Sequence, residues 1–445
     1  MKDRSDRRKF IKSAVAGSIG LGLASEIHAF NILNTYPVKD KYRVAVMGVN
    51  ARGMDHVRAY LKQSKAELAY ICDVDQQALK KAMDTAVQGG AKPKGVTDFR
   101  RALEDKTVDV LSIAAPDHWH APAAILGLKA GKHIYIEKPG SHNPAEAEFL
   151  LDAMAKYKDK VVQMGNQRRS WPRVREAMQT LHSGEIGRVY YARTWYTNTR
   201  ASIGKGNVVS VPSHLDYELW QGPAPRKPFK DNLIHYNWHW HWNWGTGEVV
   251  NNGVHFIDLA RWGLNVQYPK KVFSTGGRYH YKDDWETPDT QIATFDFDDG
   301  KTIAWEGRSC NPRGINDMGS GVSFHGENGT LELHNNSYKI FDNKGKVVKA
   351  AEPTTNTTVT QTGPGFDLDK DHFTNFFEGI ENGSALNSLY SDCYKSVLLC
   401  HLANISYRTG RALDCDTKDG HIKDDSDAGK LWSREYESGW KPTLT

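Results

Sequence analysis

The chain has 445 residues, of which 39% are hydrophobic and 25% are charged, and this globular composition excludes a fibrous or disordered protein. The length is sufficient for two or three domains with a sizeable core, while a mean hydropathy of −0.60 excludes a polytopic membrane protein. Residues 1–24 carry a net charge of +4 out of the formal +5, so the rest of the chain is almost neutral and gives no indication of a nucleic-acid partner.

The N-terminal segment resembles a twin-arginine export signal. Arg7 and Arg8 precede Phe10, and a short, weakly apolar stretch rich in Gly and Ala follows at residues 14–24. The pattern predicts export of the folded protein to the periplasm by the twin-arginine machinery. Because the apolar stretch is short and rich in glycine, no stable membrane anchor is expected. Residues 1–40 are therefore assigned to the signal and a linker.

From residue 42 onward, short apolar runs alternate with helical patterns, which is typical of βαβ units around a parallel sheet. The strand at residues 43–47 leads into a turn from Gly48 to Gly53, and the next strand ends at Asp73. This order predicts a dinucleotide-binding turn in which Asp73 accepts the adenosine ribose hydroxyls, so NAD is favoured over NADP. Asn50 stands where a second glycine is usual, and we expect it to tolerate a left-handed backbone.

Three further strands are predicted at residues 108–114, 133–136 and 161–164, and each is followed by polar side chains. Ligands of open α/β sheets bind at the carboxyl ends of the strands. The sequence therefore predicts that the functional site lies along this edge of the sheet.

The run Ala-Gly-Lys-His-Ile-Tyr-Ile-Glu-Lys-Pro at residues 130–139 is similar to the hallmark of the Gfo/Idh/MocA family, which includes glucose-fructose oxidoreductase and inositol dehydrogenase. The resemblance implies that Lys138 lies beside the nicotinamide and the substrate hydroxyl, and the export signal indicates an exported member. An ammonium group can polarise a hydroxyl and help to remove its proton, which independently supports Lys138 as a catalytic residue. The cofactor contacts that the resemblance implies are Gly48, Asn50, Arg52, Gly53, Asp73, Pro116, Trp119, His120, Glu137, Lys138 and Asn166.

The second half of the chain has longer strands rich in Tyr, Trp and Thr, separated by Gly and Asp/Asn turns, as in a mostly antiparallel sheet. The predicted fold class is α/β: an N-terminal Rossmann domain with a doubly wound parallel sheet, followed by an α+β domain with a large, mostly antiparallel sheet. The predicted boundaries are 41–168 for the first domain, 169–370 for the second, and 371–445 for helices and a tail that pack back on the body. The resemblance implies that the second sheet carries the substrate and mediates a homo-oligomer.

Residues 235–245 place Trp at every second position with His and Asn between. In an extended conformation the rings would share one face and suit a sugar, so Trp244 is predicted to contact the substrate. The alternative is that at least half of these rings pack the loop onto the sheet. Because His239 and His241 have no apparent third ligand and the five cysteines include no C-x-x-C pair, no metal site is predicted.

A helical pattern follows, in which Asn251, His255 and Asp258 share one face. It resembles the family's catalytic helix, where an aspartate precedes a histidine by four residues, but Asn251 replaces that aspartate. We therefore predict that His255 and Lys138 form the acid–base pair, with Asn251 as an orienting group and with Arg168 and Asp258 on the substrate. Two alternatives stay open: His255 caps a helix–sheet contact, or Asp258 is structural.

These observations predict an NAD-dependent oxidoreductase acting on a secondary alcohol of a small carbohydrate. Because a periplasm holds no free NAD pool, the cofactor is expected to be tightly bound and recycled. The first alternative is a redox-neutral, NAD-dependent glycoside hydrolase of the N-acetylgalactosaminidase type, although those relatives usually carry Glu-Val-Pro where this chain has Glu137-Lys138-Pro139. The second alternative is a noncatalytic sugar-binding protein.

Overall fold

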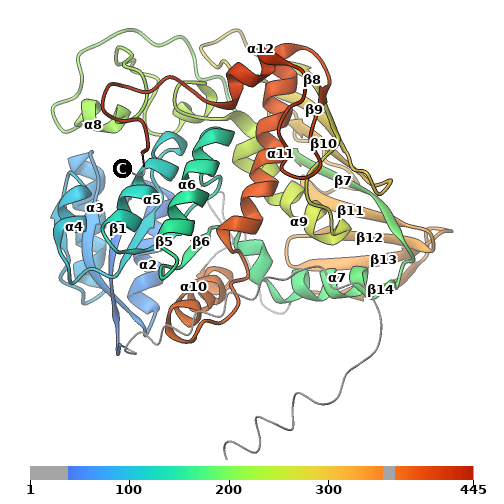
Figure 1. Cartoon of the computed structure of the whole chain (residues 1–445), viewed down its shortest axis with the longest axis horizontal. Helices are drawn as coiled ribbons and strands as arrows, with labels where there is room; N and C mark the ends of the chain where they lie inside the picture. Colours follow the sequence, from blue (N-terminus) through green and yellow to red (C-terminus); the bar gives the residue numbers. More distant parts are fainter. Residues whose placement is uncertain (1–38, 354–365, 444–445) are drawn as a thin grey trace, which may run out of the picture. The chain divides into compact units, whose positions relative to one another are not determined.

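The computed structural model describes residues 39–353 and 366–443, so the predicted export signal lies outside the described residues. Two separate sheets organise this part of the chain (Figure 1). No helix in the described ranges is long and apolar enough to cross a membrane.

The first sheet has six parallel strands in the order β3-β2-β1-β4-β5-β6. This order, with the chain starting in the middle and winding outward in both directions, is that of a dinucleotide-binding Rossmann fold. Its strands are β1 (Tyr42–Met47), β2 (Ala66–Cys72), β3 (Lys94–Val96), β4 (Val110–Ile113), β5 (His133–Ile136) and β6 (Val162–Met164). Apart from the edge strand β3, they are mostly apolar runs because a parallel sheet is buried on both faces.

Helices cover both faces of this sheet. Those from the first half are α2 (Arg52–Lys62), α3 (Gln76–Gln88), α4 (Arg100–Glu104), α5 (His120–Lys129) and α6 (Pro144–Lys156), with the 3-10 turns η1 (Asp117–Trp119) and η2 (Gln167–Ser170). The Asp75 side chain caps α3 by accepting from two backbone N–H groups. One face is completed by α10 (Phe366–Asn382), whose buried Phe373 and Phe376 pack with Tyr135 of β5.

The second sheet has nine strands in the order β14-β13-β12-β11-β7-β10-β9-β8-β15. Every neighbouring pair is antiparallel except β7 and β10, so the predicted α/β fold class with two different sheets is confirmed. The strands are β7 (Val189–Thr197), β8 (Lys271–Gly277), β9 (Thr290–Asp296), β10 (Thr302–Arg308), β11 (Ser320–Gly326), β12 (Gly329–His334), β13 (Ser337–Asp342), β14 (Val347–Ala351) and β15 (Leu413–Asp414).

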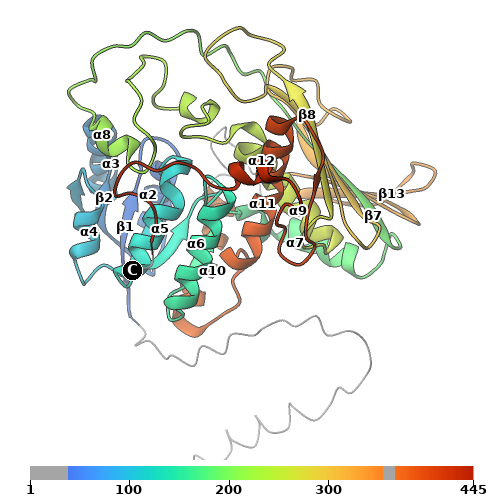
Figure 2. The same ribbon diagram turned by 45° about the horizontal axis from the view of Figure 1, so that its top comes forward.

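One face of the second sheet is covered by helices, as Figure 2 shows. These are α7 (Pro172–His182), α9 (Val254–Leu264) and α11 (Tyr390–Thr409). The opposite face carries Phe273 and Ile292, which are 45% and 49% exposed. The remaining short helices are α8 (Tyr217–Gln221), η3 (Asn237–Trp240), η4 (Val249–Gly253), α12 (Ser426–Gly429) and η5 (Lys430–Trp432).

A long segment between β7 and η4, residues 199–245 and here called the strap, reaches from the second sheet to the carboxyl edge of the first (Figure 1). The Gln76 N–H donates to the His214 carbonyl at 2.9 Å, and the Asp216 N–H donates to the Val74 carbonyl at 3.0 Å. The strap has an apolar cluster of its own, formed by Leu215, Tyr217, Trp220, Ala224, Phe229, Leu233, Trp238 and Trp244. It therefore docks on the loop after β2 as an ordered unit.

Residues 415–443, here called the C-terminal segment, return to the first domain and cross it beside α5 and α6 (Figures 1 and 2). The ring of Trp440 meets that of Trp119 edge-on at 5.1 Å. The Glu437 N–H donates to the Pro223 carbonyl of the strap at 3.1 Å. The strap and the C-terminal segment thus hold each other against the first domain.

Candidate active site

The glycine turn after β1 has the backbone that a dinucleotide requires. Gly48 has φ +81°, and a side chain on it would lie 2.7 Å from the Ala115 backbone; one on Gly53 would lie 1.7 Å from the Gly48 carbonyl oxygen. Neither position tolerates another residue. Asn50 is exposed and lies outside the left-handed region, so the turn forms without using the tolerance expected of this residue.

Two buried polar side chains at this edge fit NAD. Asp73 follows β2 and accepts from the backbone N–H groups of Val49 at 2.7 Å and Asp75 at 2.9 Å; each oxygen keeps a further lone pair for a ribose hydroxyl. Burial raises the pKa of Asp73. Asn166 follows β6 and is 1% exposed, and neither polar atom of its amide has a partner among the described residues. An amide left unpaired in this way is suited to the polar groups of a bound cofactor.

Lys138 follows β5, the strand next to β6 in the sheet, and contacts the helix that carries the predicted acid–base histidine. Its Nζ donates to the backbone carbonyl of Asn251 at 2.7 Å and to the Asn251 Oδ1 at 3.2 Å. Burial lowers the pKa of Lys138, while the charges of Glu137, Asp117 and Glu248 oppose the shift. A lysine with a lowered pKa releases its proton more readily than an exposed one.

The contact with Asn251 depends on irregular backbone. Residues 249–253 form a π-helical turn, η4, immediately before α9. Such turns are rare and occur frequently at functional sites. Here the turn presents the Asn251 carbonyl to Lys138, so the residue contacts the lysine through its backbone as well as through its amide. Its predicted role as an orienting group at the substrate remains a prediction.

His255 lies in the first turn of α9 and is partly exposed. Burial lowers its pKa well below the usual range, and the charges of Lys138 and Arg168 lower it further. No hydrogen bond of its ring to another described residue is found, so both nitrogens remain for a ligand. The structure thus brings Lys138, Asn251 and His255 together, and a neutral imidazole there is able to accept a proton.

Two acidic residues near Lys138 were missed from the sequence. Asp117 is 5% exposed and its Oδ2 accepts from the Thr246 hydroxyl at 2.6 Å; burial raises the pKa of Asp117 to about 6. Glu248 is 4% exposed and forms a two-point ion pair with Arg200 at 2.5 and 3.2 Å. Glu248 precedes Asn251 by three residues, and this helical spacing was a usable signal.

Arg52 and Glu137 are both engaged in hydrogen bonds and ion pairs inside the protein, and their contact with NAD remains a prediction. The Arg52 guanidinium donates to Glu137 at 2.9 Å and to both oxygens of Asp369 at 2.7 and 3.0 Å. Glu137 also contacts His56 at 3.0 Å and accepts from Gln167 at 2.8 Å. Although burial opposes it, the charge of Arg52 and the His56 contact lower the pKa of Glu137. The network fixes the strand end that carries Lys138.

Side chains of Trp119 and His120 also hold the loop after β4. The Trp119 indole donates to the Trp220 carbonyl at 3.0 Å, and the His120 ring contacts the Ala115 carbonyl at 2.7 Å. Pro116 directly precedes the turn η1. Their contact with NAD remains a prediction.

The burial and the ion pair of Asp258 support the alternative that this residue is structural. It is 1% exposed, and both its oxygens accept from Arg169 at 2.7 and 2.8 Å. Arg168, by contrast, is partly exposed on the side of α9 that carries Phe256. The two adjacent arginines therefore have different roles.

The aromatic segment is not extended, so the expected separation of rings and polar groups was wrong. Asn237–Trp240 form a 3-10 turn, and Trp238, Trp240 and Trp244 are 8%, 1% and 5% exposed. Trp240 stacks on Trp285 with ring centroids 4.0 Å apart. Most of these rings pack the loop, and Trp244 belongs to the apolar cluster of the strap, which supports the alternative interpretation of this segment. His239 remains partly exposed.

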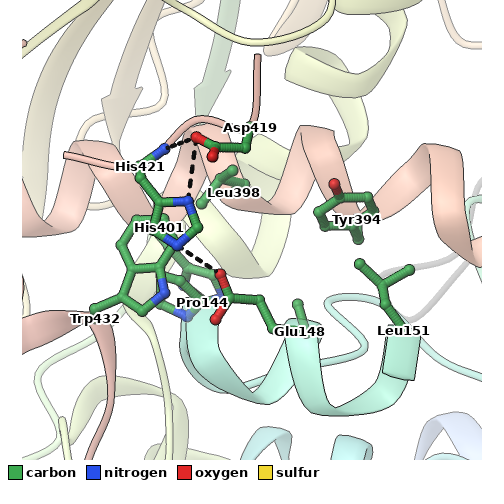
Figure 3. Close-up of a pocket in the computed structure, with 10 residues that line it drawn as sticks. Pro144, Glu148, Leu151, Tyr394, Leu398, His401, Asp419, His421 and Trp432 are labelled. Atoms are coloured by element: carbon green, nitrogen blue, oxygen red, sulfur yellow. Dashed lines mark hydrogen bonds and ion pairs between the residues drawn. The ribbon is translucent and has the colours of Figure 1, made fainter. Parts of the chain in front are cut away.

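Two cavities lie elsewhere and are lined by none of the predicted site residues. One, of about 190 Å³, lies between α6, α11 and the C-terminal segment, where His421 contacts Glu148 and Asp419 at 3.0 and 3.1 Å (Figure 3). The other, of about 390 Å³, is lined by Trp242 and Arg408 among others. No cluster of three metal-ligating side chains is found in residues 39–353 and 366–443.

Comparison with known proteins identifies the family. Residues 42–166 match the model of the Gfo/Idh/MocA oxidoreductase family with an NAD-binding Rossmann fold, and residues 190–442 match the model of its C-terminal alpha/beta domain. A curated relative, a glycosyl hydrolase family 109 protein of Shewanella baltica, is 30% identical over 184 residues, which are 36% of this chain and 39% of that protein. The chain thus spans about two fifths of the length of this curated relative.

Solved structures share the fold across most of the chain. Levoglucosan dehydrogenase in complex with NADH and levoglucosan is 20% identical with a TM-score of 0.64, covering 84% of this chain and 99% of that one. The myo-inositol 2-dehydrogenase of Lactobacillus plantarum is 19% identical with a TM-score of 0.62, covering 84% and 100%. With both domains matched, the chain belongs to the Gfo/Idh/MocA oxidoreductase family, and its first domain is an NAD-binding Rossmann domain.

Proposed function

We propose that this protein is an oxidoreductase that transfers hydride between a secondary alcohol of a carbohydrate and NAD. The observation that carries the proposal is the contact of Lys138 with Asn251 on the helix of His255, at the sheet edge where Asp73 and Asn166 fit the cofactor. When bound, NAD supplies the hydride acceptor at C4 of its nicotinamide.

The protein's own residues manage the hydroxyl proton. Lys138 Nζ binds the substrate oxygen and stabilises negative charge that develops on it, while the neutral His255 ring accepts the proton. Asn251 keeps the lysine in position through its backbone carbonyl and its amide. Since an amide carries no charge, it does not raise the pKa of Lys138 as an aspartate would.

The strap supports the expectation that NAD is retained and recycled. It docks on the loop after β2, where Asp75 contacts His235 at 2.8 Å and His214 at 3.6 Å. This is the end of the site that takes the adenosine ribose in a Rossmann fold. A cofactor covered by an ordered segment leaves slowly, which suits an enzyme that regenerates NAD between two half-reactions.

A redox-neutral glycoside hydrolase is the second candidate, and the curated relatives favour it. Oxidation at C3, elimination across C2 and C1, hydration and reduction need a base for the C2 proton besides the groups at the hydroxyl. Asp117, with its pKa raised to about 6 by burial, is a residue suited to that step. A glycoside that releases its aglycone with no net change in NADH would favour the hydrolase.

The first experiment is to purify the protein, release any ligand by denaturation and measure NAD per chain by mass spectrometry. Sugars and glycosides are then added to the holoprotein while NADH absorbance and products are followed. The proposal expects near-stoichiometric NAD and a substrate-dependent absorbance change that Lys138→Met reduces at least ~100-fold. Binding of a sugar with no redox change or product in the wild type would instead identify a noncatalytic sugar-binding protein.

Two further proposals concern the whole protein. The Arg7-Arg8 segment supports twin-arginine export to the periplasm, which cell fractionation with Arg7→Lys and Arg8→Lys tests. The exposed Phe273 and Ile292 on the uncovered face of the second sheet support assembly of copies through that face.

A further inference from the structure

Arg168 is a charged side chain beside the proposed acid–base pair that the mechanism above does not use. It lies in η2, directly after β6. Its guanidinium carbon is 4.7 Å from the ring centroid of Trp171 and 4.8 Å from that of Phe256. The charge of Arg168 also lowers the pKa of His255, so the guanidinium lies near the imidazole.

No carboxylate pairs with Arg168 within residues 39–353 and 369–443. The adjacent Arg169 shows the usual arrangement, because it forms ion pairs at 2.7 Å with Asp258 and at 2.7 Å with Asp392. Burial lowers the pKa of Arg168 to about 10, and the only group that opposes the shift is the Tyr196 phenol. Arg168 is therefore a cation at neutral pH without an anionic partner among the described side chains.

The surrounding carboxylates do not supply that partner. Glu248 is paired with Arg200, and Glu137 is paired with Arg52. Both Lys138 and Arg168 depress the pKa of His255 by their positive charge. Asp117, which is charged at neutral pH with a pKa of about 6, acts on Lys138 and not on Arg168. The unpaired positive charge of Arg168 thus favours a ligand of the opposite sign.

The ring contacts also indicate which part of Arg168 remains for a ligand. Cation–π contacts use the flat faces of a guanidinium, which leaves the N–H edge. Two parallel N–H groups on that edge match the two oxygens of a planar carboxylate.

We propose that the substrate is an acidic sugar, a uronic acid or its glycoside, whose carboxylate is bound by Arg168. The inference rests on the proposed oxidoreductase function and adds the substrate class to it. Arg168 is then the residue that selects acidic over neutral sugars, while Lys138 and His255 act on the hydroxyl.

The first test needs no variant. Holoprotein with its NAD is titrated with three matched ligands: methyl glucuronide or galacturonide, the methyl ester of the same compound, and the neutral methyl hexoside. Calorimetry measures affinity and NADH absorbance measures the redox step. The free acid is expected to bind at least ~10-fold more tightly than the ester or the neutral sugar, because only the acid offers two anionic oxygens.

The second test changes the protein. Arg168→Gln is expected to weaken binding of the acid roughly 10- to 100-fold with little effect on the neutral sugar, and Arg168→Lys to retain part of the preference because it keeps the charge without the fork. Arg193→Gln is the matched control, since it removes an arginine paired with Glu306 on the second sheet.

The outcomes separate this inference from the proposed function. If acid, ester and neutral sugar bind equally and Arg168→Gln weakens all three alike, the acidic substrate is overturned while turnover upholds the oxidoreductase. If a sugar phosphate or sulfate binds better than the uronate, the carboxylate assignment is overturned. If the acid binds through Arg168 yet no ligand changes NADH absorbance or yields a product, the anion site stands and the oxidoreductase proposal fails.

Discussion

At the residue scale, Asn251 decides how strongly Lys138 holds its proton. An aspartate at this position would place a negative charge within hydrogen-bond distance of Nζ, since the Asn251 Oδ1 lies 3.2 Å away. The amide keeps the geometry without that charge, so the lowered pKa that burial imposes on Lys138 survives. The sequence shows that an asparagine replaces the usual aspartate at position 251. It does not predict the contact of Lys138 with the Asn251 backbone carbonyl, because that contact depends on the π-helical turn.

Asn251→Asp is expected to raise the pKa of Lys138 by about 1 unit or more, since an opposite charge favours the ammonium form. The limb of the pH–rate profile that reports lysine deprotonation then moves to higher pH. Asn251→Ala, which removes the amide without adding charge, should leave that limb within about half a unit of its original position. If this limb of the pH–rate profile moved by the same amount in both variants, it would not report the deprotonation of Lys138.

Asp117 links acidity to stability. Its pKa in the folded protein, about 6, lies above the ordinary value of 3.8 because burial disfavours the charged form. Its stabilising contribution is therefore present below about pH 4 and is lost as pH rises through 6. Asp117→Asn keeps an acceptor for the Thr246 hydroxyl. Because an amide does not ionise, the variant does not lose folding stability at this position as the pH rises.

Urea unfolding at two pH values tests this. Asp117→Asn should be more stable than wild type by about 1–3 kcal/mol at pH 8, and the difference should shrink markedly at pH 4.5. Asp284→Asn, a change at an acid outside the site, is the control for general charge effects. If Asp117→Asn increased the free energy of unfolding by the same amount at both pH values, a raised pKa for Asp117 would be contradicted.

At the element scale, the strands, the glycine turn and the helix of His255 were predictable because their signals are local: apolar runs, turn glycines and helical spacing. The docking of the strap was not. The burial of Trp238 and Trp244 depends on packing partners far away in the sequence. The alternation of Trp with polar residues is therefore not sufficient to predict that the segment is an extended strand. Likewise, the ion pair between Arg52 and Asp369 was not predictable, because no local pattern connects residues that lie 317 positions apart.

Gly222 tests the docking of the strap. It has φ +43°, and a side chain there would lie 2.0 Å from the Trp119 ring. Gly222→Ala is expected to cost roughly 3 kcal/mol or more of unfolding free energy, from backbone strain and overpacking together, and to speed NAD loss during dialysis.

Gly204→Ala is its control, because Gly204 has φ +68° with nothing within 4 Å of the added carbon. That variant should cost only about 1 kcal/mol through backbone strain and should keep its NAD. Equal unfolding midpoints and NAD contents in the two variants would mean that the Trp119 contact does not hold the strap.

At the scale of the whole molecule, we predict that copies of the chain associate through the uncovered face of the second sheet. If copies assemble through this face, the double variant Phe273→Lys, Ile292→Lys should weaken association at least ~10-fold, since both side chains lose apolar burial. Sedimentation velocity over a concentration series measures it. Tyr279→Lys, at a residue 70% exposed outside the strands, should leave association unchanged. A wild type that stays monomeric at all concentrations contradicts the proposed assembly.

The contact of Trp440 with Trp119 also sets an order of events during synthesis. At about 5–20 residues per second, Trp440 leaves the ribosome roughly 15–65 s after Trp119, when the strands of both sheets have already been made. Until then the first domain lacks its C-terminal segment, and the strap lacks the partner that binds at Pro223. The nascent chain therefore passes through an interval in which the loop after β4 is folded without its contact with Trp440.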